Sequence, residues 1–405
     1  STVAAVAATL MAYDVDDLDQ DWNSVGATNI TLNGDSVRVQ GVGAVVDGGT
    51  VTIASSGTYV ISGTLYDGRI RVDTEDKKMV KLVLNGADIT CSTSAAIYVV
   101  NAEKTVITLA EGTVNRVADG AQYLFEDSVS DEPNAAIFSH DDLTINGSGS
   151  LTVEANYDNG IQSKDDLKIV GGRITVTAVN DGIKGRDSVA IRDGKVTVTA
   201  GGDGMRASND VDAEKGIVFI EGGDITLAAG MDGIQAETSL FVSGGMTAIL
   251  AGGGSANGGR HMTWSSGGPG GQRPRESSSA STGDSAKGLK AGIDLVVTGG
   301  GIIVDSSDDA VHSNGSIAIG GGDLMLATGD DGIHADASVH IFGGTISITA
   351  SYEGIESAVV TVDGGNIHVV SSDDGINISA GNDGSGMMGM RLGQDSFASS
   401  ASTYL

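Results

Sequence analysis

The chain has 405 residues and a formal net charge of -30 at pH 7, because 53 Asp and Glu outnumber 23 Lys and Arg. This excess of negative charge argues against nucleic acid and anionic membrane surfaces as partners, unless a cation intervenes. Aromatic residues make up 4% of the chain, which argues against flat aromatic platforms that bind neutral glucans. Cys91 is the one cysteine, so a disulfide framework is excluded.

Residues 1–27 are predicted to form an amino-terminal arm. The arm starts with an Ala- and Val-rich stretch and continues with the acidic run from Asp14 to Asp21. Two interpretations stay open: a surface leader, or a strand exchanged with another copy of the chain, since an apolar arm can add to an open sheet edge. The chain starts at Ser1 and no apolar run is long enough to span a bilayer. We therefore expect a secreted protein of the bacterial cell surface or extracellular matrix, whose signal peptide has been removed.

Residues 28–133 are predicted to form an amino-terminal β layer and the first turns of the fold. Short apolar strands alternate there with turn pairs such as Asn33-Gly34 and Asp67-Gly68. The spacing of these pairs is irregular, as expected for the terminal units of a repeat protein.

Residues 134–383 repeat a unit of about 22 residues, the signature of a solenoid. The unit between Asn180 and Gly204 has an Asp-Gly corner, a short strand, a second turn and a strand of alternating polar and apolar residues. Since no unit can bury its own apolar face, successive units must stack with their strands parallel. We predict an all-β fold, a right-handed parallel β-helix of about 11 turns. Glycine is expected at the corners because positive φ and close backbone approach cost it little.

Two segments depart from the repeat. A flexible insertion is predicted at 252–285, where Gly and Ser dominate, and a Gly-, Met- and Ser-rich tail at 384–405. The insertion is either a plain surface loop or, through His261 and Trp264, a cover for a ligand. The tail ends like the start of another strand, and an uncapped rod exposes unpaired backbone groups. The native chain therefore either continues past Leu405 or docks its open end against a neighbour.

The stacking of turns places acidic corner residues in columns. Carboxylates about 4.8 Å apart repel each other and need a compensating charge. Calcium is the natural candidate, since it takes several hard oxygen ligands in loose geometry. The His and Cys clusters that zinc or copper prefer are missing from the sequence. For any single Asp-Gly, the alternative is a carboxylate that caps a turn. The predicted calcium ligands are Asp181, Asp203, Asp232, Asp308, Asp309, Asp330, Asp331, Glu353, Asp373 and Asp374 in the corners, and Asp165, Asp166 and Asp187 in a second column.

Cationic side chains recur beside these acids and are the predicted ligand-binding residues. They are Lys184, Arg206, Lys287, Lys290, His312 and His334. One interpretation is that they relieve the repulsion within the acidic column. The other is a ladder of donors that grips carboxylates spaced along an extended acidic polymer, with calcium bridging protein and glycan.

The corner sequences resemble those of a bacterial family of extracellular carbohydrate-binding β-helix proteins. The resemblance lies in Asp-Asp-Gly-Ile-His at 330–334, Asp-Asp-Gly-Ile-Asn at 373–377, and similar strings at 131–139, 157–166 and 306–315. It covers most of the chain, from Thr28 to Gly386. It implies binding of acidic pectic polymers such as polygalacturonate, and of cellulose, with calcium held at the Asp-Asp-Gly corners of a fold similar to pectate lyases.

Three functions are consistent with these features. The first hypothesis is a calcium-stabilised binding or adhesion protein for acidic polysaccharide and cell-wall glycans, without catalytic residues. An alternative is a self-assembling subunit of an extracellular surface or biofilm fibre, built by end-to-end stacking or strand exchange. Another is a calcium-dependent polysaccharide lyase with Lys184 or Arg206 as the base, although nothing in the sequence distinguishes one basic site from its neighbours.

Overall fold

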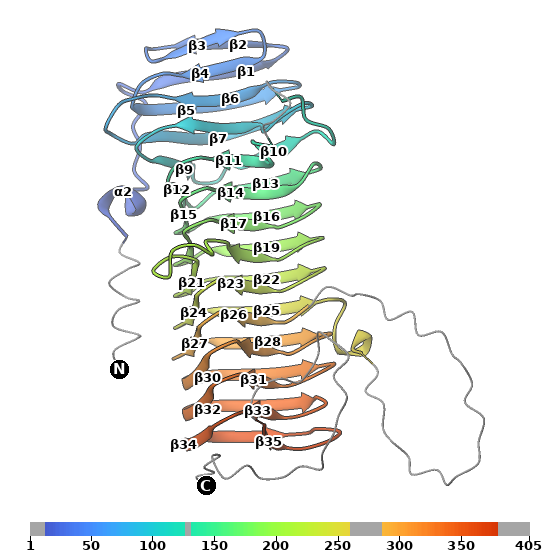
Figure 1. The fold of residues 1–405 in the computed structure, drawn as a ribbon. Helices are drawn as coiled ribbons and strands as arrows, with labels where there is room; N and C mark the ends of the chain where they lie inside the picture. The colour runs from blue at the N-terminus through green and yellow to red at the C-terminus, as the bar shows by residue number, and fades with distance from the viewer. Residues whose placement is uncertain (1–12, 126–130, 260–285, 380–405) are drawn as a thin grey trace, which may run out of the picture.

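The structure, a computed structural model, describes residues 13–125, 131–259 and 286–379. Within these ranges the chain is all β apart from a short helix, α2 (Val15–Leu18), and one 3₁₀ turn, η1 (Ser255–Asn257). Its strands stack as rungs along one long axis, from β2 and β3 at one end to β34 and β35 at the other (Figure 1). No helix of the described ranges is long and apolar enough to cross a membrane. Residues 1–12 of the predicted arm, most of the predicted 252–285 insertion and the predicted 384–405 tail lie outside the described residues.

Two long sheets make up the rod. The first sheet has 21 strands: β1 (Thr28–Gly34), β2 (Ser36–Gln40), β5 (Gly57–Leu65), β7 (Val80–Cys91), β9 (Thr105–Leu109), β10 (Val114–Asp119), β12 (Leu143–Gly147), β13 (Ser150–Ala155), β15 (Asp166–Ile169), β16 (Arg173–Ala178), β18 (Ser188–Ile191), β19 (Lys195–Ala200), β21 (Ile217–Ile220), β22 (Asp224–Ala229), β24 (Ser239–Val242), β25 (Met246–Ala251), β27 (Asp294–Val297), β28 (Gly301–Ser306), β30 (Ser316–Thr328), β32 (Ser338–Ala350) and β34 (Val360–Val369). The second sheet has 14 shorter strands: β3 (Ala44–Asp47), β4 (Thr50–Ile53), β6 (Arg69–Asp73), β8 (Ile97–Asn101), β11 (Ala135–Ser139), β14 (Asn159–Ser163), β17 (Ile183–Gly185), β20 (Met205–Ala207), β23 (Ile234–Ala236), β26 (Leu289–Ala291), β29 (Val311–Ser313), β31 (Ile333–Ala335), β33 (Ile355–Ser357) and β35 (Ile376–Ile378).

Equivalent strands of successive units pair in parallel and in register. For example, β17 lies against β20 with Ile183 opposite Met205 and Lys184 opposite Arg206. The amino-terminal pairs β1–β2 and β3–β4 are antiparallel. The predicted all-β fold with stacked parallel strands is confirmed, and this architecture is consistent with a parallel β-helix.

The core follows from the alternation within each strand. In β16, Ile174, Val176 and Ala178 are buried while the residues between them are exposed. Inward-facing residues from all rungs form one continuous apolar cluster that extends from Ile30 to Val360. Full burial of each Val, Leu or Ile contributes roughly 1.5–3 kcal/mol, so stability arises from stacking and not from any single unit.

The glycines of the two turns serve different purposes. Positive φ occurs in the second turn of the unit, as at Gly172 with a φ of 94° and Gly194 with a φ of 114°. The corner residue Gly182 does not have positive φ, so that part of the corner prediction was wrong. A Cβ at Gly182 would lie 2.2 Å from Val198 Cγ1 and 2.8 Å from the Gly204 carbonyl oxygen. Close approach of neighbouring rungs is therefore the reason for glycine at this corner.

The described part of the arm lies on the outer face of the first sheet of the same chain. Helix α2 sits beside β12 and β15 (Figure 1). Farther along the same face, Tyr13 packs against Ala190, Phe219 and Phe241. At the other end of the arm, Trp22 packs against a small apolar cluster that includes Val83. The arm thus spans several rungs of its own rod.

Buried charges fix α2 to this face. The fully buried carboxylate of Asp17 accepts hydrogen bonds from Lys104 Nζ (2.9 Å), Thr144 Oγ1 (2.6 Å) and Lys168 Nζ (3.2 Å). Burial by itself raises the pKa of Asp17, but the bonds from Lys104 and Thr144 outweigh it and hold the pKa below its usual value. Asp17 is therefore ionised and belongs to a set of buried ion pairs.

Candidate functional site

The corner residues that precede the strands of the second sheet form a hydrogen-bonded ladder. In each step the backbone N–H of one corner residue donates to the side-chain Oδ1 of its equivalent one rung earlier. The steps, donor first, are Asp181 to Asn159 (3.0 Å), Asp203 to Asp181 (3.1 Å), Asp232 to Asp203 (3.0 Å), Lys287 to Asp232 (2.8 Å), Asp331 to Asp309 (3.1 Å) and Glu353 to Asp331 (3.2 Å). Because the amide of Asn159 makes the same bond as the aspartates, this ladder requires an oxygen acceptor but not a negative charge.

The outward-facing residues of the second sheet form a second column beside the corners. Strand register places in this column Gln162, Lys184, Arg206, Gln235, Lys290, His312, His334, Glu356 and Asn377. The structure thus brings five of the six predicted ligand-binding residues together. We call this column and the adjoining corner residues, Asn159 to Glu353, the charged seam.

Ion pairs join the two columns of the charged seam. Lys184 Nζ lies 2.7 Å from Asp181 Oδ2, and Lys290 Nζ lies 2.8 Å from Asp232 Oδ2. Each carboxylate therefore uses one oxygen for the ladder and turns the other toward a base. The side chains of Lys184 and Lys290 remain 20% and 26% exposed, so these cations also reach solvent.

Arg206 and Asp203 are a weaker pair in the middle of the charged seam. Arg206 Nη1 lies 3.5 Å from Asp203 Oδ2, and neither Asp203 Oδ2 nor Arg206 Nε has a hydrogen-bond partner among the described residues. Burial raises the pKa of Asp203 to about 7, and the neighbouring carboxylates Asp232 and Asp181 act in the same direction. Asp203 is thus a corner acid whose negative charge is poorly compensated.

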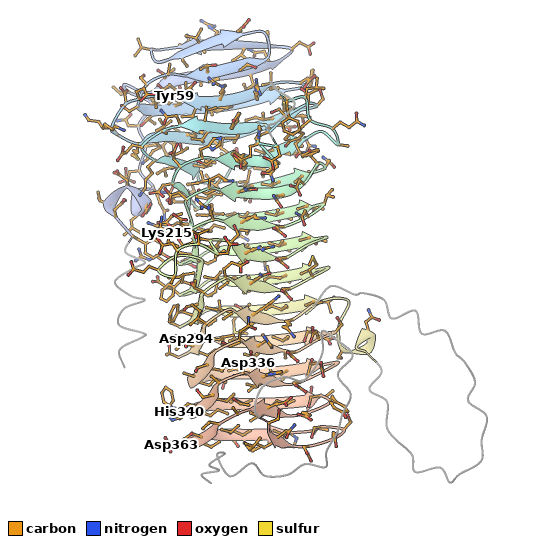
Figure 2. All side chains as sticks on the ribbon, viewed as in Figure 1. Tyr59, Lys215, Asp294, Asp336, His340 and Asp363 are labelled. Atoms are coloured by element: carbon orange, nitrogen blue, oxygen red, sulfur yellow. The ribbon has the colours of Figure 1, made fainter. Side chains whose placement is uncertain are left out.

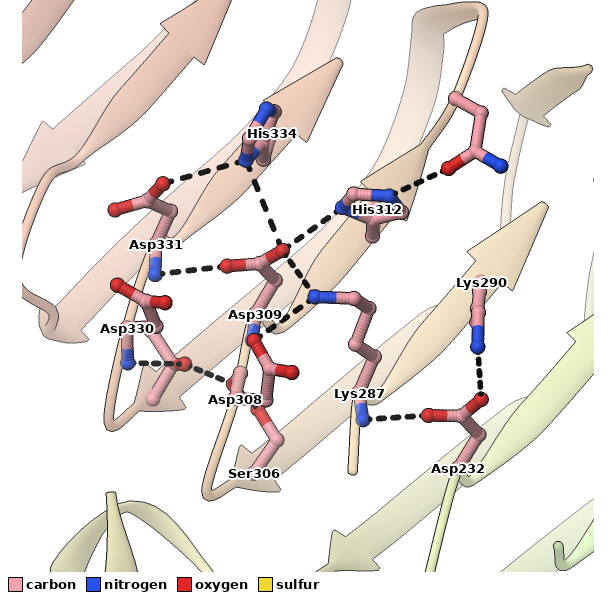
Figure 3. Close-up of polar contacts among 12 residues, drawn as sticks. Asp232, Lys287, Lys290, Ser306, Asp308, Asp309, His312, Asp330, Asp331 and His334 are labelled. Atoms are coloured by element: carbon pink, nitrogen blue, oxygen red, sulfur yellow. Dashed lines mark hydrogen bonds and ion pairs between the residues drawn. The ribbon is translucent and has the colours of Figure 1, made fainter. Parts of the chain in front are cut away.

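Lys287 occupies a corner position where the other rungs have an acid or an amide. Its Nζ donates to Asp309 Oδ2 (2.7 Å) and Asp308 Oδ1 (2.8 Å), as Figure 3 shows. Burial lowers the pKa of Lys287, but the two carboxylates outweigh this effect and hold the pKa above its usual value. The predicted ligand-binding residue Lys287 is thus buried and directed at the protein's own carboxylates.

His312 and His334 stack one rung apart, on β29 and β31. Their ring centroids are 5.0 Å apart in an edge-to-face arrangement, and both rings are buried. His312 Nδ1 lies 2.8 Å from Asp309 Oδ2, and His334 Nδ1 lies 3.4 Å from Asp331 Oδ2. The statement that histidine clusters are missing was therefore wrong. The repeat period could have revealed the cluster, because it aligns these two residues.

The electrostatics of this cluster divide its carboxylates. Burial raises the pKa of Asp309, but Lys287 and His312 outweigh it, so the pKa lies well below its usual value. Burial raises the pKa of Asp331 to about 8, with the nearby Asp309 charge adding to the effect. Burial lowers the pKa of His334, but Asp331 and Asp309 raise it to about 9. Two neighbouring aspartates of the same column thus hold their protons with very different strength.

The predicted calcium ligands fall into separate groups. Asp308, Asp309 and Asp330 each offer a carboxylate oxygen within 4.8 Å of the others, and Asp308 and Asp330 are partly exposed. Oxygen donors at this spacing fit a hard divalent cation, and Lys287 Nζ is the charge that competes with it. Asp373 and Asp374 lie exposed on the last described rung.

The second predicted acidic column is also a cluster in space. Asp165, Asp166 and Asp187 line a surface pocket of about 220 Å³ together with Ser188, Asp212, Glu214, Lys215 and Ile217. Burial raises the pKa of Asp165 to about 7, and its hydrogen bond with Asp187 further raises it. Lys215 Nζ pairs with Asp187, which leaves part of the pocket's negative charge uncompensated.

The chain is similar to carbohydrate-binding proteins and to a polysaccharide lyase-like protein. The family described as "Carbohydrate-binding domain-containing protein" matches residues 47–332. A protein of that description from Acetivibrio thermocellus is 46% identical over 158 residues, which are 38% of this chain and 55% of the relative. The chain therefore matches about half the length of that relative. A solved structure, the polysaccharide lyase-like protein from C. thermocellum in a gadolinium derivative, aligns with a TM-score of 0.55 and 42% sequence identity, over 56% of this chain and 92% of the other.

Proposed function

Because the chain belongs to the family of carbohydrate-binding domain-containing proteins, we propose that it binds an acidic polysaccharide outside the cell through the charged seam, without cleaving it. The observation that carries this proposal is the column of Lys184, Arg206 and Lys290, which are stacked on the second sheet and partly exposed. Strands of a sheet lie about 4.8 Å apart, so polar groups recur along the rod at a nearly constant spacing. A polymer with regularly repeated carboxylates matches such a surface better than a compact ligand does.

The proposal requires a bridging cation. The net charge of -30 repels a polyanion, and the cations of the seam are already paired with Asp181, Asp203 and Asp232. We propose calcium, held first by Asp308, Asp309 and Asp330 and second by the cluster of Asp165, Asp166 and Asp187. Bound calcium would supply positive charge for uronate carboxylates, while Lys184 and Arg206 would orient the chain by charged hydrogen bonds.

Binding is favoured over lyase chemistry by the protonation state of Arg206. A general base must lose its proton near the working pH. Arg206, one of the two predicted lyase bases, has a raised pKa, because the charges of Asp203 and Asp181 outweigh its burial. It stays protonated and can donate hydrogen bonds but cannot accept a proton. We therefore expect polygalacturonate to be bound without formation of ultraviolet-absorbing unsaturated products.

Calcium is expected to raise the melting temperature of the chain, and Asp308→Asn with Asp330→Asn is expected to remove most of that rise. An ion that binds the folded state alone at a concentration of 100 times its Kd stabilises it by about 2.7 kcal/mol. Thermal unfolding in calcium and in chelator measures the effect. Asp224→Asn with Asp363→Asn is the control, since both residues are exposed on the first sheet. If calcium raises the melting temperature of the wild type and of the Asp308 and Asp330 variant equally, calcium does not bind at these residues.

Lys184→Gln with Arg206→Gln is expected to weaken binding of polygalacturonate in calcium by roughly tenfold or more, since hydrogen bonds to charged groups contribute roughly 1.5–3 kcal/mol. Glutamine is the suitable replacement because Gln162 and Gln235 occupy the same column. Affinity electrophoresis with and without calcium measures the change. Lys195→Gln is the matched control, because Lys195 is exposed on the other sheet. Affinity that is unchanged in the double variant would refute the role of the seam.

A further inference from the structure

The two buried histidines of the charged seam direct the same ring nitrogen toward the same carboxylate. His312 Nδ1 lies 2.8 Å and His334 Nδ1 lies 3.8 Å from Asp309 Oδ2. His334 Nδ1 is also 3.4 Å from Asp331 Oδ2 (Figure 3). The two imidazoles and the Asp309 carboxylate therefore converge between β29 and β31, whereas Asp331 groups with His334 and Glu356.

The spacing of Asp309, His312 and His334 is close to that of a four-coordinate metal site with three protein ligands. Ligand atoms that lie about 2.0–2.1 Å from a tetrahedral zinc ion are roughly 3.3 Å from one another. The separations of 2.8 and 3.8 Å from Asp309 Oδ2 lie on both sides of this value. The ligand atoms of Asp309, His312 and His334 all lie within 4.8 Å of one another. Movements of a few tenths of an ångström would bring them to a common ion.

The outer ring nitrogen of His312 is held in the way that metal-bound imidazoles require. His312 Nε2 lies 2.9 Å from Asn314 Oδ1. The corresponding oxygen beside His334, Asp336 Oδ1, lies 3.6 Å from Nε2, beyond hydrogen-bond distance. The acceptor at His312 holds the proton on Nε2 and directs Nδ1 toward a metal ion, which would replace the proton between Nδ1 and Asp309. Without a proton or a cation between them, the lone pairs of His312 Nδ1 and Asp309 Oδ2 would repel each other.

Lys287 completes the surroundings of the cluster. Its Nζ donates to Asp309 Oδ2 (2.7 Å), as expected for a ligating carboxylate that is itself hydrogen-bonded. The cluster therefore has two imidazole nitrogens, one carboxylate and one outer cation. Mixed nitrogen and oxygen donors suit zinc and its neighbours in the first transition series, whereas calcium prefers oxygen alone.

We propose that Asp309, His312 and His334 form a binding site for one divalent transition-metal ion, with zinc as the reference ion and a fourth position for water. The ion would join β29 to β31 and so tie two rungs of the rod together. This site goes beyond the proposed function, because its ligands are buried and it needs no glycan. Asp309 is shared with the proposed calcium ligands, but the two histidines belong to the transition-metal set alone.

The test is a zinc titration of the full chain after removal of metals by a chelator, in competition with a fluorescent zinc indicator. The wild type is expected to bind one zinc ion at this site, and His312→Gln with His334→Gln to weaken that binding at least 100-fold. Asn314→Ala, which removes the outer acceptor of His312, is expected to weaken it roughly 10-fold to 100-fold. Cobalt bound in place of zinc should give the strong visible bands of a four-coordinate ion.

The control replaces a histidine outside the seam. His340 pairs with Asp363 on the first sheet (Figure 2), and His340→Gln should leave zinc binding unchanged. Far-ultraviolet circular dichroism checks that each variant is folded. The proposal is overturned if the wild type and the His312 and His334 variant bind zinc with equal affinity. The zinc titration uses no glycan or calcium, so its failure is distinguishable from failure of polygalacturonate binding.

Discussion

Replacement of Asp17 by Ala is expected to lower the free energy of unfolding by about 3–5 kcal/mol, although Asp17 lies in the arm and not in the rod. The fully buried carboxylate of Asp17 contacts Lys104 and Lys168, which are themselves buried. Its removal takes the buried carboxylate away from both ammonium groups and leaves Lys104 with the half-exposed Asp14 as an ion-pair partner. The loss of a buried ion-pair partner is far more costly than the loss of an exposed one.

Urea denaturation at neutral pH measures this loss. Asp16→Ala is the control, since Asp16 is on the same short helix and only partly buried. A second variant, Asp17→Leu with Lys104→Met, removes the charge and its principal partner together, and we expect it to be less destabilising than Asp17→Ala. Proteolysis that cleaves the arm early in Asp17→Ala would show that the charges hold the arm on the rod. If the Asp17→Ala and Asp16→Ala variants have equal free energies of unfolding, the ion pairs of Asp17 do not stabilise the protein.

The contacts of Asp17 illustrate what sequence analysis could not provide. Asp17 and Lys104 are 87 residues apart, and no repeat relates the arm to the rod. The acidic run of the arm was visible in the sequence, but its partners are single lysines: Lys104 just before β9 and Lys168 on β15. Such a contact depends on how the arm crosses the rod, which no periodicity encodes.

The repeated part of the chain was more predictable. The period of the unit fixes which residues stack, so the parallel register and both columns of the charged seam could be predicted from the spacing of Asp-Gly corners. The period does not say where each side chain points. Lys287 was predicted to bind a glycan or to relieve the repulsion of the acidic column, and its Nζ reaches Asp309 on the next rung. His312 and His334 are aligned by the same period, yet their cluster becomes evident only when residues are compared rung by rung.

Asp203 provides a test of whether the corner acids serve as turn caps or as ion ligands. The ladder bond that Asp203 makes through Oδ1 is also made by Asn159, whose amide Nδ2 donates to Gln162 Oε1 at 2.8 Å. Asp203→Asn with Arg206→Gln would copy this native pair. It would also remove Asp203 Oδ2 and Arg206 Nε, two of the buried atoms that have no hydrogen-bond partner among the described residues.

This double variant is expected to be more stable than the wild type at pH 8 in chelator, by about 2–4 kcal/mol. The pKa of Asp203 rises from an ordinary 3.8 to about 7 on folding. Between these values the folded state keeps a proton that the unfolded state has released, so stability falls as pH rises, and the loss is complete above about pH 7. Because a tenfold change in proton affinity corresponds to about 1.4 kcal/mol, this difference in pKa sets an upper limit of about 4 kcal/mol. The lost pair between Arg206 and Glu237 is partly exposed and offsets about 1 kcal/mol or less.

Denaturation of both proteins at pH 4 and pH 8, each in chelator and in calcium, separates the two roles of the corner acids. If Asp203 is a turn cap, the advantage of the variant appears at pH 8, vanishes at pH 4 and is the same in calcium as in chelator. If Asp203 holds calcium, the ion neutralises the negative charge of the buried carboxylate. The wild type is then more stable than the double variant at pH 8 in calcium. If the double variant is less stable than the wild type at pH 8 in chelator, the pKa of Asp203 is not raised on folding. A raised pKa means that the ionised Asp203 destabilises the folded state, so its removal should increase the free energy of unfolding.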